Sequence, residues 1–127
     1  MSPEPISQPA SLLTNDQKRA AHAYDCVQGV GKDQLKEYKI AVNSLATNIK
    51  RCGLAAAMAF LERGSDRDAN TLLIDHLKRA NIAGITDSTE SLTKQVSELE
   101  LTKYMLATRE LLKWMIWFRR AVQAHPI

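Results

Sequence analysis

Cysteine, glycine and proline are all scarce in this chain of 127 residues. It contains two Cys, five Gly and four Pro, and three of the prolines fall within the first nine residues. So few turn-forming residues favour helices over a turn-rich β fold. Cys26 and Cys52 have neither a CxxC partner nor a histidine at ligand spacing, so we expect two buried, reduced thiols rather than a disulfide or a zinc site.

Long hydrophobic runs are missing as well. No apolar run approaches the ~18 residues that a membrane span requires, and no signal peptide is recognisable, so we expect a cytoplasmic protein. Apolar residues make up 45% of the chain and charged residues 24%, which is ordinary for a globular domain. We predict one domain over residues 13–127, preceded by a flexible, Pro- and Ser-rich leader over residues 1–12.

Catalytic and metal-binding motifs are the third absence. His22, His76 and His125 lie on different segments, with no HExxH motif and no Cys/His cluster. Phosphate loops, dinucleotide-binding glycine motifs and nucleophile elbows are not found either. The sequence therefore predicts neither an enzyme nor a metal site, and it implies no cofactor and no small-molecule substrate.

Helical periodicity and capping signals run through the rest of the chain. Thr14 and Gln17 form a capping box, Asp33 is the expected cap of a second helix, and Gly53 is expected to end it. Further helices are expected over 54–63, from Ser65 to about 79, from Asp87 to about 96, and from about Ser97 onward. The predicted fold is all-α, a single-domain bundle of five to six helices with a long C-terminal helix.

Apolar spacing gives the expected core. The predicted inner face of the second helix consists of Leu35, Tyr38, Val42, Leu45 and Ile49. Tyr24 and Phe60 are also expected in the core, whereas His22 is expected to point away from it.

The C-terminal helix is the most informative segment. Its predicted core stripe runs through positions 101, 104, 105, 108, 111, 112, 115, 118 and 122. At ~100° per residue, Arg109, Lys113 and Arg120 share a second face, and Trp117 is expected almost opposite the core. Between Lys103 and Arg120 there are five basic residues and a single acid.

These surface residues allow more than one interpretation. The basic row, with Lys18, Lys39 and Lys50 from earlier helices, could follow nucleic-acid phosphates or could simply be a solvated face. Arg119 is expected near the core stripe, where it could reach solvent or hold an acid. Trp114 and Trp117 could be additional core, or they could contact another protein.

Several stretches together resemble one family, the small subunit of the type III-B CRISPR RNA-guided effector, the fifth protein of the Cmr series. The strongest segment is the C-terminal helix, with Leu101, Tyr104, Thr108-Arg109-Glu110 and Trp117-Phe118-Arg119-Arg120. The earlier matching stretches are Gln17-Lys18, Ala23-Tyr24, Val27, Glu37-Tyr38-Lys39, Lys50, Gly53-Leu54 and Ala57-Met58-Ala59-Phe60.

This resemblance implies a non-catalytic helical subunit of an antiviral ribonucleoprotein, stacked along the channel of guide RNA and target RNA. The implied partners are the backbone subunits, the large subunit, copies of itself, and both RNAs. The implied phosphate contacts are Lys18, Lys39, Lys50, Arg109, Lys113, Arg119 and Arg120. Trp114 and Trp117 are the implied subunit contacts. The alternative function is a helical protein–protein adaptor without direct nucleic-acid binding.

Overall fold

The computed structural model describes residues 14–63 and 67–125. Within this part of the chain there are six α-helices and no strand, so the predicted all-α fold with its long C-terminal helix is confirmed. The helices are α1 (Asn15–Gln28), α2 (Lys32–Cys52), α3 (Leu54–Glu62), α4 (Arg67–Lys78), α5 (Leu92–Ser97) and α6 (Leu101–Ala124). The predicted leader, the Ser65 cap and the side chain of Asp68 lie outside the described residues.

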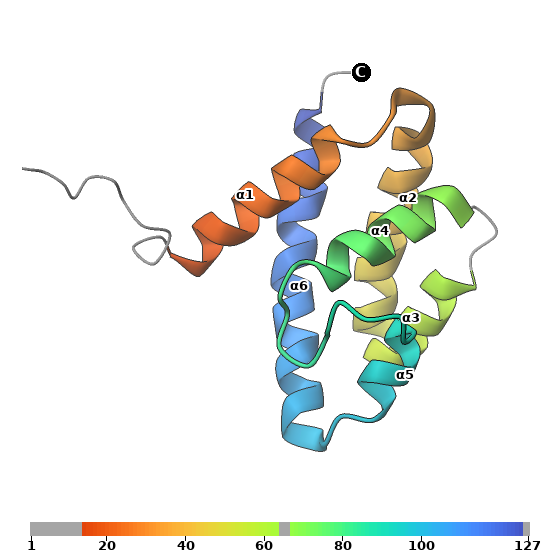
Figure 1. The fold of residues 1–127 in the computed structure, drawn as a ribbon, viewed down its shortest axis with the longest axis vertical. Helices are drawn as coiled ribbons and strands as arrows, with labels where there is room; N and C mark the ends of the chain where they lie inside the picture. The colour runs from red at the N-terminus through yellow and green to blue at the C-terminus, as the bar shows by residue number, and fades with distance from the viewer. Residues whose placement is uncertain (1–13, 64–66, 126–127) are drawn as a thin grey trace, which may run out of the picture.

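The two long helices, α2 and α6, pack against each other along the long axis of the molecule (Figure 1). Helix α1 crosses α6, and α4 crosses α2. Helix α3 returns along α2 and also contacts α4 and α5. Helix α6 is therefore covered by α1 on one side and by α2 on another, and its remaining side faces solvent.

The ends of the first two helices follow from local chemistry. The predicted capping box of α1 is confirmed: Gln17 N–H donates to Thr14 Oγ1 at 3.1 Å, and Thr14 N–H donates to Gln17 Oε1 at 2.7 Å. The prediction that Asp33 caps α2 is wrong, because the N-cap is Gly31 and Asp33 lies in the first turn. There its carboxylate is placed to interact favourably with the helix dipole. Gly53 ends α2 as predicted, at a φ of 91° that suits glycine.

Helix α5 begins later than its sequence indicates. The predicted start at Asp87 is wrong, since the N-cap is Ser91, whose Oγ accepts a hydrogen bond from Lys94 N at 3.1 Å. The buried side chain of Gln95 explains the difference. Its Oε1 accepts from Thr86 N at 2.7 Å and its Nε2 donates to Glu90 O at 3.2 Å, which holds residues 86–90 in a non-helical path.

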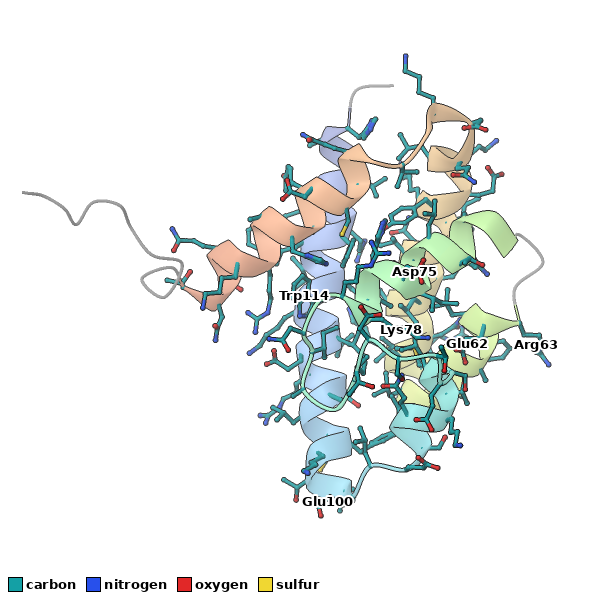
Figure 2. The ribbon with its side chains drawn as sticks, viewed as in Figure 1. Glu62, Arg63, Asp75, Lys78, Glu100 and Trp114 are labelled. Carbon is teal, nitrogen blue, oxygen red and sulfur yellow. The ribbon has the colours of Figure 1, made fainter. Side chains whose placement is uncertain are left out.

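A carboxylate from another helix completes the start of α5. Glu62, at the end of α3 (labelled in Figure 2), accepts hydrogen bonds from Leu92 N at 2.7 Å and from Thr93 N at 3.0 Å. These amides have no partner within their own helix, so the carboxylate satisfies donors that would otherwise need water. Glu62 thereby fixes the short helix α5 against α3.

The buried residues confirm the predicted inner face of α2 but not the predicted burial of Tyr24 and Phe60. All five residues predicted for the inner face of α2 are buried. Tyr24 and Phe60, predicted in the core, are 37% and 48% exposed. The buried positions of α1 are Arg19, Ala23 and Val27, so its core face is rotated away from Tyr24. Phe60 likewise lies beside the face that α3 buries, which is formed by Leu54, Ala57, Met58 and Leu61.

The two thiols also differ from expectation, since Cys26 is half-buried and Cys52 is exposed. Helix α6 begins at Leu101 rather than near Ser97. Its buried residues are Ala107, Leu111, Trp114, Met115, Phe118, Ala121 and Val122. Leu101 and Met105, predicted in the core stripe, are 73% and 57% exposed. Helix α1 covers a second side of α6, where Trp114 packs against His22, so the buried surface extends beyond the predicted stripe.

Candidate nucleic-acid interface

Helix α6 carries five exposed basic residues. Lys103 lies in its first turn, and we call the other four the α6 basic row: Arg109, Lys113, Arg119 and Arg120. The helical repeat brings the first, second and fourth to one side of the helix. Arg119 is exposed, so its side chain reaches solvent. At ~100° per residue its position lies between the row and the buried positions 115 and 122, which is beside the core stripe as expected.

A buried arginine connects α1 to this helix. Arg19 is only 7% exposed. Its Nη1 donates to Asp16 Oδ1 and its Nη2 to Glu110 Oε1, both at 2.9 Å. Burial alone would lower the pKa of Arg19, but the hydrogen bonds and charges of Glu110 and Asp16 outweigh it and raise that pKa. The guanidinium therefore stays charged and holds the first turns of α1 against α6.

The same network reaches the basic row. Glu110 Oε2 lies 3.8 Å from Lys113 Nζ, so Lys113 is partly neutralised while its side chain remains largely exposed. Among the described residues, no ion pair is formed by Arg109, Arg119 or Arg120. These three guanidinium groups carry charge that no acidic side chain of the described residues neutralises, so they can attract an anionic partner.

A polar cavity of about 660 Å³ opens between the start of α1 and the middle of α6. It is lined by Thr14, Asn15, Asp16, Arg19, Glu110, Lys113, Ile116, Trp117 and Arg120. The Arg120 guanidinium carbon lies 5.1 Å from the centre of the Trp117 ring, a cation–π contact. Trp117 Nε1 donates weakly to Asp16 Oδ1 at 3.5 Å.

The two tryptophans take different places. Trp117 is partly buried rather than opposite the core, because α1 crosses α6 beside it. Trp114 is 6% exposed and lies where α1 meets α6 (Figure 2). Its ring packs edge to face on His22 at 5.3 Å and near Phe118 at 6.1 Å. For Trp114 the burial favours the core interpretation over contact with another subunit.

The other predicted phosphate contacts are exposed but lie outside the cavity. Lys18 is on α1, and Lys39 and Lys50 are on α2. The two α2 lysines are eleven positions apart, which is about three turns, so they share one side of that helix. Of the seven predicted contacts, the structure brings Lys113 and Arg120 together around one cavity.

A buried polar cluster joins α1, α2 and α4. Tyr38 Oη lies 2.7 Å from His76 Nδ1, and His22 Nε2 lies 3.2 Å from the His76 carbonyl oxygen and 3.3 Å from Cys26 Sγ. His22 was expected to point away from the core, and that prediction is wrong. Burial lowers the pKa of His76 to about 4 and raises the pKa of Cys26 to about 11. Burial also raises the pKa of Tyr38.

The hydrogen bonding and burial of this cluster indicate a structural role. A neutral His76 can accept the hydrogen bond of the protonated Tyr38 hydroxyl. His76 is only 9% exposed, so a substrate cannot reach it as it could reach a group in a cleft. Across residues 14–63 and 67–125, no group of three or more His, Cys, Asp or Glu residues is placed to hold a metal ion. None of the described helices is both long enough and apolar enough to span a membrane.

Comparison with known proteins places this arrangement within a class of CRISPR-associated proteins. The family model described as "CRISPR-associated protein (Cas_Cmr5)" matches residues 15–125. The chain is 34% identical over 115 residues to the CRISPR system Cmr subunit Cmr5 of Thermus thermophilus, covering 89% of this chain and 96% of that protein. The protein belongs to the Cmr5 family.

A crystal structure gives the same result for the fold. The CRISPR-associated Cmr5 family protein from Thermus thermophilus superimposes with a TM-score of 0.75 at 28% identity. The superposition covers 87% of this chain and 98% of that one. The resemblance inferred from the helical motifs is thereby confirmed.

Arg19 is the residue that sequence reasoning missed. Its spacing of four from Ala23 and eight from Val27 places it on the core face of α1. An arginine on an apolar face signals a buried acid as partner. The identity of that partner, Glu110, depends on how α1 crosses α6.

Proposed function

We propose that this protein is a non-catalytic structural subunit of a cytoplasmic Cmr ribonucleoprotein complex in antiviral defence, and that it contacts RNA phosphates through the α6 basic row. The observation that carries the proposal is a set of exposed guanidinium groups without acidic partners, among the described residues, on one long helix. Contacts of this kind fix a protein on a nucleic-acid backbone without reading its sequence. Membership of the Cmr5 family supports a place beside guide RNA and target RNA.

Binding of labelled single-stranded RNA to the purified protein across a salt series tests this proposal. With one phosphate contact from each of the four basic residues of the row, the slope of log K against log salt should be about −3 for single-stranded RNA. Between about 50 and 200 mM salt the affinity should then fall by about 50-fold. A flat response would show that phosphate contacts do not carry the binding and would contradict the proposal.

Contact with other subunits is the second part of the proposed function, and two exposed apolar surfaces support it. One is a groove of about 430 Å³ between α2 and α3, at whose edges Ile40 and Phe60 are 54% and 48% exposed. The other is the start of α6, where Leu101, Met105 and Leu106 are exposed. Exposed apolar clusters of this kind commonly mark protein contacts. We propose that copies stack by placing the start of α6 of one copy in the groove of the next.

Two charged substitutions test this stacking. Phe60→Glu blocks the groove and Met105→Glu blocks the helix start, so neither variant alone should self-associate in sedimentation velocity at high protein concentration. A head-to-tail contact uses two different surfaces, so an equimolar mixture should regain one good contact. The expected result is a one-to-one dimer that does not grow further. Self-association by either variant alone, or no dimer in the mixture, would contradict this contact.

A further inference from the structure

The polar cavity between α1 and α6 has a fixed shape. Asp16 and Glu110 are held from opposite sides by the two nitrogens of Arg19, at 2.9 Å each. Arg19 and Asp16 both lie on α1 and Glu110 lies on α6, so the Arg19–Glu110 pair joins the two walls. The helices cannot separate here without breaking this charge-assisted hydrogen bond. The cavity volume of about 660 Å³ lies within the range of ~300–1,000 Å³ that small-molecule sites occupy.

The charges of the cavity select the kind of group that can enter it. Asp16 and Glu110 oppose Arg19, Lys113 and Arg120, which leaves a formal charge of +1 (three positive minus two negative). The two carboxylates would repel a phosphate placed deep in the cavity. A neutral group with hydrogen-bond donors suits the interior, and an anion suits the rim, where Arg120 has no acidic partner among the described residues.

The residues that line the cavity can both stack on a flat neutral group and form hydrogen bonds with it. Trp117 presents an indole, and the Arg120 guanidinium already stacks over it at 5.1 Å. Both groups line the cavity, so a planar ring can stack on either. Thr14, Asn15 and Asp16 lie in the first turn of α1 or just before it and supply polar atoms at the edge of the cavity. A nucleobase combines a flat ring, donors and acceptors at its edge, and a phosphate one sugar away.

We infer that this cavity holds one unstacked base of a single-stranded RNA whose phosphates follow the α6 basic row. The inference rests on the proposed function. Single-stranded RNA is commonly bound by placing splayed bases on aromatic rings or arginine planes. The row then provides the salt-dependent, sequence-independent affinity, and the cavity adds a contact that requires a base.

The test compares two strands with the same number of phosphates, one an ordinary single-stranded RNA and the other lacking all its bases. Stacking on an aromatic side chain contributes about 5- to 150-fold in affinity per base. The full-length protein should therefore bind the ordinary strand about 5- to 150-fold more tightly at a fixed salt concentration. Trp117→Ala should remove this difference, and Trp117→Phe should retain part of it.

Tyr24→Ala is the matched control, because it removes an exposed aromatic ring outside the cavity and should leave the difference between the strands unchanged. Circular dichroism establishes that each variant is folded. Equal, salt-dependent binding of both strands would overturn the base site and leave the phosphate contacts intact. Binding of neither strand by the folded protein would overturn both, because the cavity is proposed to act on RNA held by the row.

Discussion

Reversing three charges of the α6 basic row, in the variant Arg109→Glu/Lys113→Glu/Arg120→Glu, should weaken RNA binding by about 100-fold at ~0.1 M salt. Each phosphate contact with single-stranded RNA contributes about 0.7 to the slope of log K against log salt. Three lost contacts therefore remove about 2 from that slope, and at ~0.1 M they remove about two powers of ten in affinity. Fluorescence anisotropy of a labelled RNA across the salt series measures both quantities.

Net charge must be separated from the position of the charges. The sequence has a formal net charge of +3, and three reversals of two charges each bring it to −3. Lys32→Glu/Arg63→Glu/Arg79→Glu produces the same change at positions outside the row. This control should retain most of the affinity and nearly the full slope. Equal losses in the two variants would mean that overall charge, and not the surface of α6, governs binding.

Acidification from pH 7.5 to pH 4 should cost about 3 kcal/mol of unfolding free energy through His76 alone. Burial is the main reason why its pKa is about 4 in the folded protein, and the charges of His22 and Arg79 add to the effect against the opposing charge of Asp75. In the unfolded chain the ordinary value is 6.5. Between these two values the unfolded state binds a proton that the folded state does not, so stability falls as the pH falls.

Above pH 6.5 the imidazole is increasingly neutral in both states and this loss disappears. The full difference between the two pKa values corresponds to about 3.4 kcal/mol at about 1.36 kcal/mol per unit, and about 3 kcal/mol of it is lost by pH 4, where His76 is half protonated in the folded protein. Urea unfolding at several pH values measures it. His76→Gln retains an acceptor for the Tyr38 hydroxyl but does not titrate. Carboxylates titrate in both proteins, so the quantity to compare is the slope of the free energy of unfolding against pH. Between pH 6.5 and 4 this slope should be steeper for the wild type than for the variant. Identical slopes would contradict this assignment.

Local signals correctly predicted one helix start and one helix end, but not the start of α2, which lies at Gly31 instead of Asp33. The Thr14–Gln17 capping box and the end of α2 at Gly53 depend on hydrogen bonds and φ values within a few residues. The buried face of α2 is set by helical periodicity, because one stripe of that helix meets all its neighbours. The family resemblance came from motifs on such segments.

Predictions failed where a distant side chain replaced a local choice. Asp87 is a reasonable cap by its own neighbours, but Gln95 holds residues 86–90 away from a helical path. Tyr24 and Phe60 have apolar spacing that helical periodicity cannot distinguish from that of residues one position away. The direction from which a neighbouring helix approaches decides which of these is covered.

In the candidate interface, too, some features follow from the sequence of one helix and others from the packing of two helices. The sequence alone determined that Arg109, Lys113 and Arg120 share one side of a long helix, because a fixed rotation per residue needs no partner. The tertiary structure alone decided that Arg19 meets Glu110, 91 positions away, that Trp114 is buried, and that Trp117 borders a polar cavity. Those three outcomes depend on where α1 crosses α6, and a crossing is set by the packing of both helices together and not by either sequence segment alone.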